Sequence, residues 1–237
     1  ISKSSIIGRI NNDLGVWEVD EATLPEALTN IKPRIIVLLN LFRDQLDRYG
    51  EVDTVRNKWQ KALSTQPKDT VLIANADDPQ IAYIAKDFKG KVVFFGINDN
   101  KLNLPEITHV ADIRYCLNCS SKLNYLALLS AHMGHYSCPN CSFKRPTPTV
   151  TASNLQFYPD FSTSAQLTIH YSLFTIHYNL PGLYNAYNIL AAISVTNFLG
   201  IERDSIKTSI SNFSAAFGRF QKVKIQGKVA HIFLIKN

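Results

Sequence analysis

Short apolar runs alternate with amphipathic stretches along the first hundred residues. The apolar runs have the length of buried strands and predict strands at residues 15–19, 34–40, 70–75 and 91–96. Between them, apolar residues recur at helical spacing and predict helices at residues 24–30, 52–64 and 79–88. Strands and helices in alternation indicate a parallel sheet covered on both faces. In such a sheet, ligands bind at the carboxyl ends of the strands.

The pattern changes after residue 103, where a loop-rich insertion at 104–148 precedes a second structured part. Antiparallel strands are predicted within 149–179, including a hairpin of residues 165–170 and 172–178. Helices follow at 186–198 and 203–213, with Gly200 ending the first. Strands at 223–226 and 229–235 are expected to begin a further, C-terminal domain. We therefore divide the chain into 1–103, 104–148, 149–222 and 223–237.

The insertion carries the four cysteines of the chain as two Cys-x-x-Cys pairs, Cys116/Cys119 and Cys138/Cys141, with eighteen residues between the pairs. Two tight turns that each present two thiolates suit a tetrahedral zinc ion, so we expect a structural zinc ribbon. Two disulfides are the alternative, but they are typical of small secreted domains. A site closed by four sulfurs leaves no open position for chemistry. The activity is therefore expected elsewhere in the chain.

Composition narrows the class of protein without identifying it. With 237 residues and 46% hydrophobic content, the chain can bury a full core. Its apolar runs are strand-sized and no signal region opens the sequence, so we expect neither a membrane span nor secretion. Zinc-binding thiols favour a cytoplasmic location. The net charge of +6 is dispersed, with local clusters at Lys144-Arg145 and 219–228 that favour a solvated surface, although a nucleic-acid-binding zinc ribbon is an alternative.

Carboxylates gather at the ends of two of the apolar runs that precede a helix, 15–19 and 70–75. Glu18, Asp20 and Glu21 lie at the end of the run at 15–19, and such a cluster favours Mg²⁺ with a nucleotide. The alternative is an acidic first turn of the next helix. After the run at 70–75, Asp77 or Asp78 is expected to cap the following helix.

Five segments, taken in order, resemble the Mur ligases, which are ATP-dependent enzymes that form amide bonds in peptidoglycan synthesis. The segments are residues 18–21, 40–50, 75–79, 182–192 and 217–220. The resemblance covers nearly the whole chain and implies the central ATPase domain of the family. It implies an α/β fold with a mostly parallel sheet flanked by helices, an additional antiparallel β region and, in this chain, the inserted four-cysteine ribbon.

The resemblance also implies roles for residues at matching positions. Glu18 would bind Mg²⁺ with ATP, and Gln45 stands where most Mur ligases have a magnesium-binding His. Arg219 would contact phosphate. The remaining nucleotide-binding residues implied by the resemblance are Asn75, Asp77, Asp78, Asn185 and Asn188.

Within the family, residues 44–50 and the ribbon together are similar to the synthetase subunit of lipid II isoglutaminyl synthase. This similarity implies that ATP phosphorylates the α-carboxylate of D-glutamate in lipid II, at the membrane surface. Ammonia from a GatD-like glutamine amidotransferase subunit would then attack the acyl phosphate to give D-isoglutamine. A Mur-type ligase that adds an amino acid instead of ammonia is the alternative within the family.

Two parts of such an enzyme have no counterpart in this sequence. There is no Gly-x-x-x-x-Gly-Lys-Ser/Thr loop to bind the phosphates. Residues 231–237 resemble the entry to the C-terminal domain, which supplies catalytic residues and the amidotransferase contact. We therefore expect a segment of a longer protein, with catalytic residues partly outside it, that is inactive alone.

Overall fold

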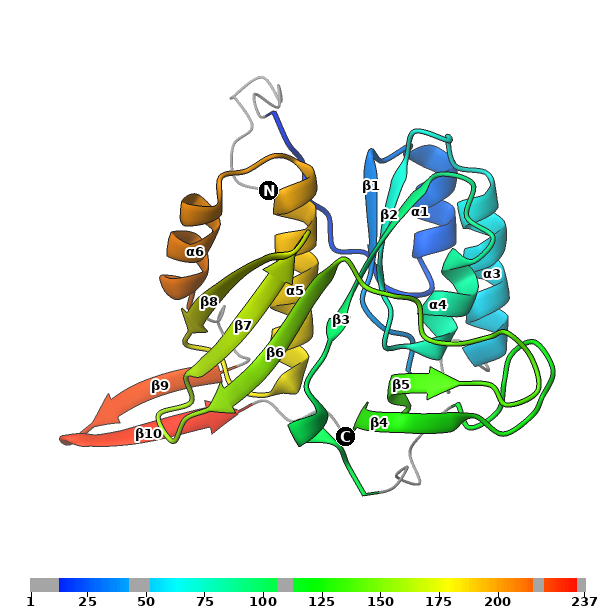
Figure 1. The fold of residues 1–237 in the computed structure, drawn as a ribbon. Helices are drawn as coiled ribbons and strands as arrows, with labels where there is room; N and C mark the ends of the chain where they lie inside the picture. The colour runs from blue at the N-terminus through cyan, green and yellow to red at the C-terminus, as the bar shows by residue number, and fades with distance from the viewer. Residues whose placement is uncertain (1–12, 43–51, 106–112, 215–219, 234–237) are drawn as a thin grey trace.

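A six-stranded mixed sheet forms the centre of the computed structural model, which describes residues 13–42, 52–105, 113–214 and 220–233 (Figure 1). The strand order is β1-β2-β3-β6-β7-β8, in which the first four strands pair in parallel and the last two add antiparallel pairs. The strands are β1 Ile35–Leu38, β2 Val71–Asn75, β3 Lys91–Ile97, β6 Val150–Phe157, β7 Thr163–Ile169 and β8 Ser172–Tyr178. The predicted α/β class, with a mostly parallel sheet and an antiparallel region, is confirmed.

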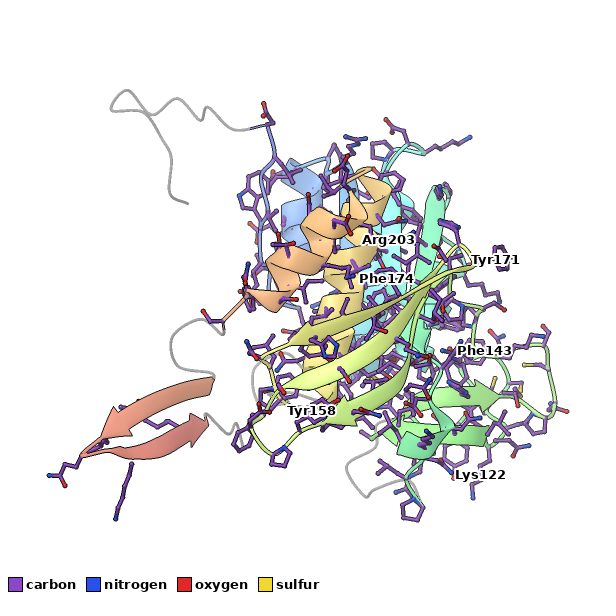
Figure 2. The ribbon with its side chains drawn as sticks, turned by 60° about the vertical axis from the view of Figure 1, so that its left-hand side comes forward. Lys122, Phe143, Tyr158, Tyr171, Phe174 and Arg203 are labelled. Carbon is purple, nitrogen blue, oxygen red and sulfur yellow. The ribbon has the colours of Figure 1, made fainter. Side chains whose placement is uncertain are left out.

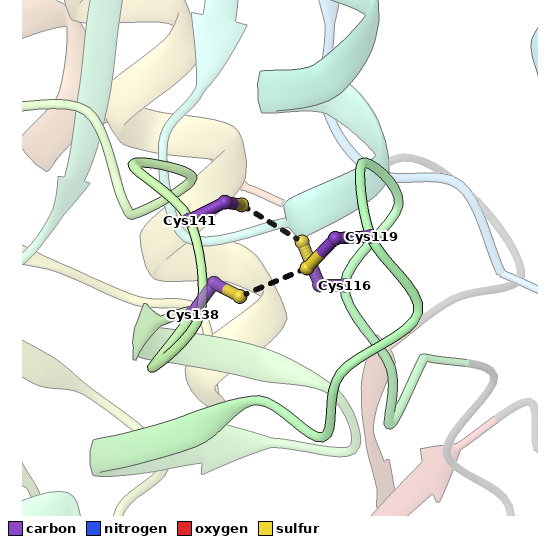
Figure 3. A group of neighbouring side chains, drawn as sticks. All are labelled: Cys116, Cys119, Cys138 and Cys141. Atoms are coloured by element: carbon purple, nitrogen blue, oxygen red, sulfur yellow. Dashed lines mark hydrogen bonds between the residues drawn. The ribbon is translucent and has the colours of Figure 1, made fainter.

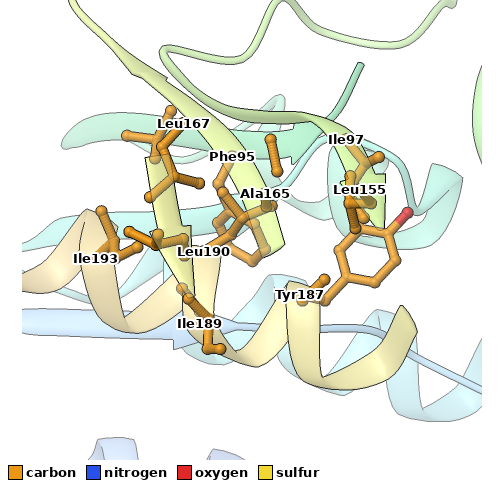
Figure 4. Packing of buried hydrophobic residues seen from close by; sticks show 14 of the residues in the cluster. Phe95, Ile97, Leu155, Ala165, Leu167, Tyr187, Ile189, Leu190 and Ile193 are labelled. Carbon is orange, nitrogen blue, oxygen red and sulfur yellow. The ribbon is translucent and has the colours of Figure 1, made fainter. Parts of the chain in front are cut away.

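Helices cover both faces of this sheet. They are α1 Leu24–Asn30, α3 Val52–Ser64, α4 Pro79–Ala85, α5 Leu183–Phe198 and α6 Arg203–Ser211, while the short 3-10 helix η1 Asn100–Leu102 follows β3. The helices α1, α3 and α4 lie on one face and α5 on the other (Figure 1). One apolar cluster includes Leu72 and Ile81, and a second includes Phe95 and Leu190 (Figure 4). All five residues of β2 are buried because both of its faces are covered.

Local sequence signals account for several element boundaries. Asp78 caps α4 by accepting hydrogen bonds from the amides of Gln80 and Ile81, as predicted, and Pro79 follows at the first helical position. Gly200 has a φ of +75°, the conformation that favours glycine just after a helix. At the far edge of the sheet, α6 lies beside β8, with its Arg203 guanidinium 5.0 Å from the Phe174 ring centroid (Figure 2).

The predicted strand at residues 15–19 is wrong. This segment has no strand pairing, and Val16 and Trp17 are 84% and 60% exposed. An apolar run becomes a strand only where a neighbouring strand completes its hydrogen bonds, and no described strand pairs with it. Helix ends also differ slightly from prediction, since α4 ends at residue 85, α5 starts at 183 and α6 ends at 211.

The two predicted C-terminal strands form a hairpin with a sheet of its own. They are β9 Phe220–Ile225 and β10 Lys228–Phe233, paired antiparallel around Gly227. β9 crosses the expected domain boundary between residues 222 and 223. The division of the chain into domains stays a prediction. None of the described helices is long and apolar enough to cross a membrane.

The insertion contains a second small hairpin, β4 Asn124–Ser130 with β5 Met133–Ser137. We call this hairpin with the two cysteine turns, residues 113–145, the ribbon. Its Tyr136 and Phe143 are buried and share an apolar cluster with Ala82 and Tyr83 of α4. The ribbon therefore packs on the main body beside the carboxyl end of β2.

Candidate functional site

The ribbon brings its four cysteine sulfurs to one point, as the spacing predicts (Figure 3). All four sulfurs lie within 4.8 Å of one another. The Sγ atoms of Cys116 and Cys141 are 3.6 Å apart, and those of Cys119 and Cys138 are 3.4 Å apart. Zn–S bonds of about 2.3 Å in a tetrahedron separate the sulfurs by about 3.8 Å. The spacing fits zinc and is far too long for the predicted alternative of disulfides, whose S–S bond is about 2 Å.

Backbone amides and a neighbouring side chain donate hydrogen bonds to these sulfurs and so favour the negative charge that binds a cation. The amides of Asn118, Asn140 and Phe143 donate to the sulfurs of Cys116, Cys138 and Cys141 at 3.4 to 3.5 Å. Hydrogen bonding from Ser121 lowers the pKa of Cys119 to about 6, whereas burial raises the pKa of Cys116 to about 12. Donors that face sulfur favour thiolate, the form that binds metal.

The ribbon is also hydrogen-bonded to the carboxyl ends of β2 and β3. The amide of Gly134 donates to the Asp77 carbonyl at 2.8 Å, and the Tyr136 hydroxyl donates to the Ala76 carbonyl at 3.2 Å. The His135 Nε2 lies 2.7 Å from the Ile97 carbonyl oxygen. These bonds place the ribbon over the segment 75–78, which sequence reasoning assigned to the nucleotide.

Asp77 is fully buried and joins three elements. Its carboxylate accepts hydrogen bonds from Arg145 Nε at 2.5 Å, from the Ile97 amide at 2.8 Å and from the Tyr187 hydroxyl at 2.9 Å. Burial raises the pKa of Asp77, while the Arg145 charge and the bonds from Ile97 and Tyr187 oppose that rise. Three donors and no acceptor around the carboxyl suit its ionised form.

Asp78 and Asn75 are fully buried as well. Besides capping α4, Asp78 accepts the Leu41 amide at 2.8 Å, and His132 Nε2 lies 3.4 Å away without hydrogen-bonding geometry. The Asn75 side chain accepts the Asp77 amide at 3.0 Å. All three predicted nucleotide residues of this segment thus have partners inside the protein, and their contact with a nucleotide stays a prediction.

The other described candidates meet at a pocket of about 580 Å³ between α5 and α6. Asn185 and Asn188 of α5 line it together with Glu18, the expected magnesium ligand. Its walls include the apolar side chains of Ile189 and Ile206. The Asn185 Nδ2 donates to the Pro181 carbonyl at 2.7 Å, which holds the start of α5. An apolar cleft edged by amide and carboxylate groups suits a flat, polar-rimmed ligand.

Two further candidates, Gln45 and Arg219, lie outside the described residues. Of the carboxylates near Glu18, Asp20 accepts the Thr23 amide at 2.8 Å just before α1, and this bonding from Thr23 lowers the pKa of Asp20. Asp20 therefore holds the turn before α1, whose first turn carries Glu26 as its acidic residue.

Sequence reasoning missed Arg145 and Tyr187. The sequence pattern predicts the cluster Lys144-Arg145 on a solvated surface, but the Arg145 side chain is only 13% exposed and pairs with Asp77. No local signal marks this pair, since its members are 68 residues apart. With Arg145 paired to Asp77, less of the positive charge is free to bind nucleic acid.

Comparisons with known proteins agree with this geometry. A model of the Mur ligase middle domain matches residues 7–196. The chain is similar to two MurT subunits of lipid II isoglutaminyl synthase (glutamine-hydrolyzing). The one from Staphylococcus aureus strain COL is 33% identical over 94% of this chain and 49% of its own length. The one from Streptococcus pneumoniae R6 is 32% identical over 100% of this chain and 51% of its own length. A pseudomurein peptide ligase type C from Methanothermus fervidus has a TM-score of 0.70 and 27% identity, covering 85% of this chain and 38% of its own. The chain spans about half the length of the curated relatives it matches.

Proposed function

Because the chain belongs to the Mur ligase family through its middle domain, we propose that it forms the ATP-binding part of a lipid II-amidating ligase. The observation that carries this proposal is the 32–33% identity to two MurT subunits across nearly the whole chain. Those relatives are named as glutamine-hydrolysing synthases. The four-cysteine cluster and the pocket at α5 supply physical support.

The pocket is the proposed site for the nucleoside of ATP. Ile189 and Ile206 offer apolar walls for the flat base, and Asn188 offers a side-chain amide with both a donor and an acceptor. Glu18 would hold Mg²⁺ at the rim, with Gln45 as a second candidate ligand and Arg219 toward phosphate. The magnesium ion, when bound, neutralises charge on the triphosphate.

The proposed reaction has two steps. The γ-phosphoryl group of ATP passes to the D-glutamate α-carboxylate of lipid II, which gives an acyl phosphate and ADP. Ammonia then forms a bond to the acyl carbon, inorganic phosphate leaves and D-isoglutamine results. A GatD-like partner subunit would release this ammonia from glutamine, and water must be kept from the acyl phosphate.

The proposal also covers the cellular location of the protein and its domain organisation. ATP and glutamine are cytoplasmic metabolites, so we propose a cytoplasmic protein that meets lipid II at the membrane surface. The proposed organisation keeps residues 1–103 and 149–222 as one ATPase domain, interrupted by the ribbon at 104–148. Residues 223–237 would lead into a further domain.

Mass spectrometry of the product tests this function. The full-length protein with its amidotransferase, lipid II, ATP and glutamine is expected to convert one carboxyl group of lipid II to a carboxamide. Omission of glutamine, with ammonium supplied instead, is expected to restore the same product. Lipid II enlarged by a whole amino acid would overturn the proposal and favour the alternative Mur-type ligase.

Substitution in the pocket tests the nucleotide site separately. Asn188→Ala is expected to weaken ATP binding about tenfold, since it removes hydrogen bonds worth about 1 kcal/mol or slightly more. Asn197→Ala is the matched control, because Asn197 lies on the same helix but does not line the pocket. Equal ATP dissociation constants for the two variants, measured by calorimetry, would place the nucleotide elsewhere.

A further inference from the structure

A buried chain of polar contacts runs from the ribbon to the helix that lines the pocket. Arg145 leaves the ribbon four positions after Cys141 and donates from Nε to Asp77 Oδ1. On the other side of the same carboxylate, Asp77 Oδ2 accepts the Tyr187 hydroxyl of α5. Figure 4 shows Tyr187 beside Leu155, with its hydroxyl directed away from α5. Two oxygens of one carboxylate thus join two elements far apart in sequence.

The ribbon end of this chain depends on the cysteine turns. The Arg145 amide donates to the Tyr136 carbonyl at 2.9 Å, and the Cys138 amide donates to the Phe143 carbonyl at 2.8 Å. Arg145 Nη2 also donates to the Ile97 carbonyl at 3.3 Å. The guanidinium is therefore fixed by the backbone of the second cysteine turn and by β3. Loss of the folded turn would release it.

Gly96 makes room for the pair. A Cβ atom added there would lie 2.7 Å from Arg145 Nη2 and 2.7 Å from Asp77 Oδ1, closer than a carbon can approach. The sequence thus keeps the one residue without a side chain beside this contact, on a strand whose other members are Val, Phe, Ile and Lys. This is an independent sign that the contact is specific.

The pocket end of the chain is the start of α5. Tyr187 lies between Asn185 and Asn188, the two residues of this helix proposed to contact ATP. The N-cap residue Gly182 offers no side chain for capping, so other contacts hold the first turns, among them the bond from Asn185 to the Pro181 carbonyl. The hydroxyl of Tyr187 is one such contact, and it is fully buried against Asp77.

We infer that Arg145 is a positioning residue for the pocket, which through Asp77 and Tyr187 couples the folded ribbon to the first turns of α5. The coupling deepens the proposed function, on which its nucleotide readout rests. It gives the ribbon a role beyond its own stability: when the cysteine turns hold a metal, Arg145 stays in place and the two asparagines keep their orientation. Arg145 touches no part of the pocket and acts only through other residues.

The test compares Arg145→Gln with Lys144→Gln in the full-length protein bound to its amidotransferase. Lys144 is the adjacent residue, is exposed and carries the same charge, which makes it a matched control. Arg145→Gln is expected to raise the ATP dissociation constant and KM about tenfold with little change in kcat, while zinc content stays at the wild-type level. Lys144→Gln is expected to match the wild type. Equal ATP affinity in the two variants would overturn the inference.

Tyr187→Phe provides a second test of the coupling, because this substitution removes only one hydroxyl and preserves the apolar ring. It is expected to weaken ATP binding in the same way, and Arg145→Gln/Tyr187→Phe is expected to be no weaker than the worse single variant, because both act through Asp77. Additive effects would contradict the coupling.

Hydrogen exchange at α5 separates this inference from the proposed function, since it needs no ATP. Arg145→Gln is expected to speed exchange of the amides early in α5 relative to Lys144→Gln. Faster exchange in a protein whose wild type binds no ATP would support the coupling and refute the ATP site. Unchanged exchange in α5 would refute the coupling whatever the protein binds.

Discussion

Asp77 and Asp78 are adjacent, fully buried carboxylates that serve different parts of the molecule. Asp78 organises its surroundings locally, by capping α4 and holding the Leu41 amide. Asp77 is satisfied by donors from β3, α5 and the end of the ribbon. A buried carboxylate is costly unless it is paired and hydrogen-bonded, so each of these donors is needed.

Arg145→Gln is expected to make stability depend on pH. The pKa of Asp77 is already raised by burial, and loss of the Arg145 charge raises it further, while Tyr187 stays protonated because burial raises its pKa as well. A carboxyl with a raised folded pKa contributes stability that is lost as the pH rises through that value. The destabilisation, about 3 kcal/mol for a broken buried pair, should therefore grow as the pH rises above 3.8, the ordinary pKa of the carboxyl, and should be larger at neutral pH than at mildly acidic pH.

Urea unfolding at the two pH values measures this difference. The added substitution Asp77→Asn removes the titrating group and is expected to flatten the pH dependence of Arg145→Gln. A loss of stability that is the same at both pH values would show that Asp77 does not titrate in this range.

Among the elements, the ribbon is built differently from the sheet. Its hairpin β4–β5 is short and irregular, with two register shifts. Its apolar contacts are made largely through Tyr136 and Phe143, whose ring centroids are 5.6 Å apart. So small a unit has little core of its own, and the four thiolates are the natural source of its stability.

Removal of zinc is expected to release the ribbon selectively. With a chelator, amides of β5 should lose protection from hydrogen exchange, while those of β6 and β7, which have a paired strand on each side, should keep theirs. Cys138→Ser should reproduce this pattern and lower the zinc content. The exposed Ser142→Ala, next to Cys141, is the control expected to behave as wild type. Equal loss of protection in β5 and β7 would mean that the ribbon and sheet unfold as one unit.

In the whole molecule, the sheet separates two apolar clusters. Phe95 of β3 is fully buried and belongs to the cluster shared by α5, β6 and β7 (Figure 4). On the other face, Leu72 and Trp59 pack among α1, α3 and α4. This two-sided burial is what holds the carboxyl ends of the strands at one edge, where the ribbon attaches.

Phe95→Ala is expected to destabilise the molecule by about 3–5 kcal/mol, since it leaves a cavity at the centre of a close-packed cluster. Circular dichroism during urea unfolding measures the change. Phe157→Ala, at a 44% exposed position in β6, is the matched control and should cost less than about 1 kcal/mol. Similar costs for both variants would mean that the cavity collapses.

The sequence pattern alone predicted the helices, strands and turns that depend on residues close together in the chain. The helices at 24–30 and 52–64 have the predicted bounds, and the bounds of β2, β3 and the β7–β8 hairpin lie within two residues of prediction. The two Cys-x-x-Cys turns converge as their spacing requires. Each of these features depends on residues a few positions apart or on burial that periodicity reveals.

Contacts between distant segments could not be read in this way. Residues 15–19 have the pattern of a strand but no strand to pair with, and Glu18 lies instead at a pocket formed by α5 and α6. In the sequence, Arg145 belongs to a basic cluster and Asp77 to the start of a helix, and nothing indicates that they pair. The two side chains meet only because the ribbon packs beside β2. The hydrogen bonds and the burial of a side chain depend on which residues the tertiary structure places beside it. Spacing along the sequence does not identify those residues.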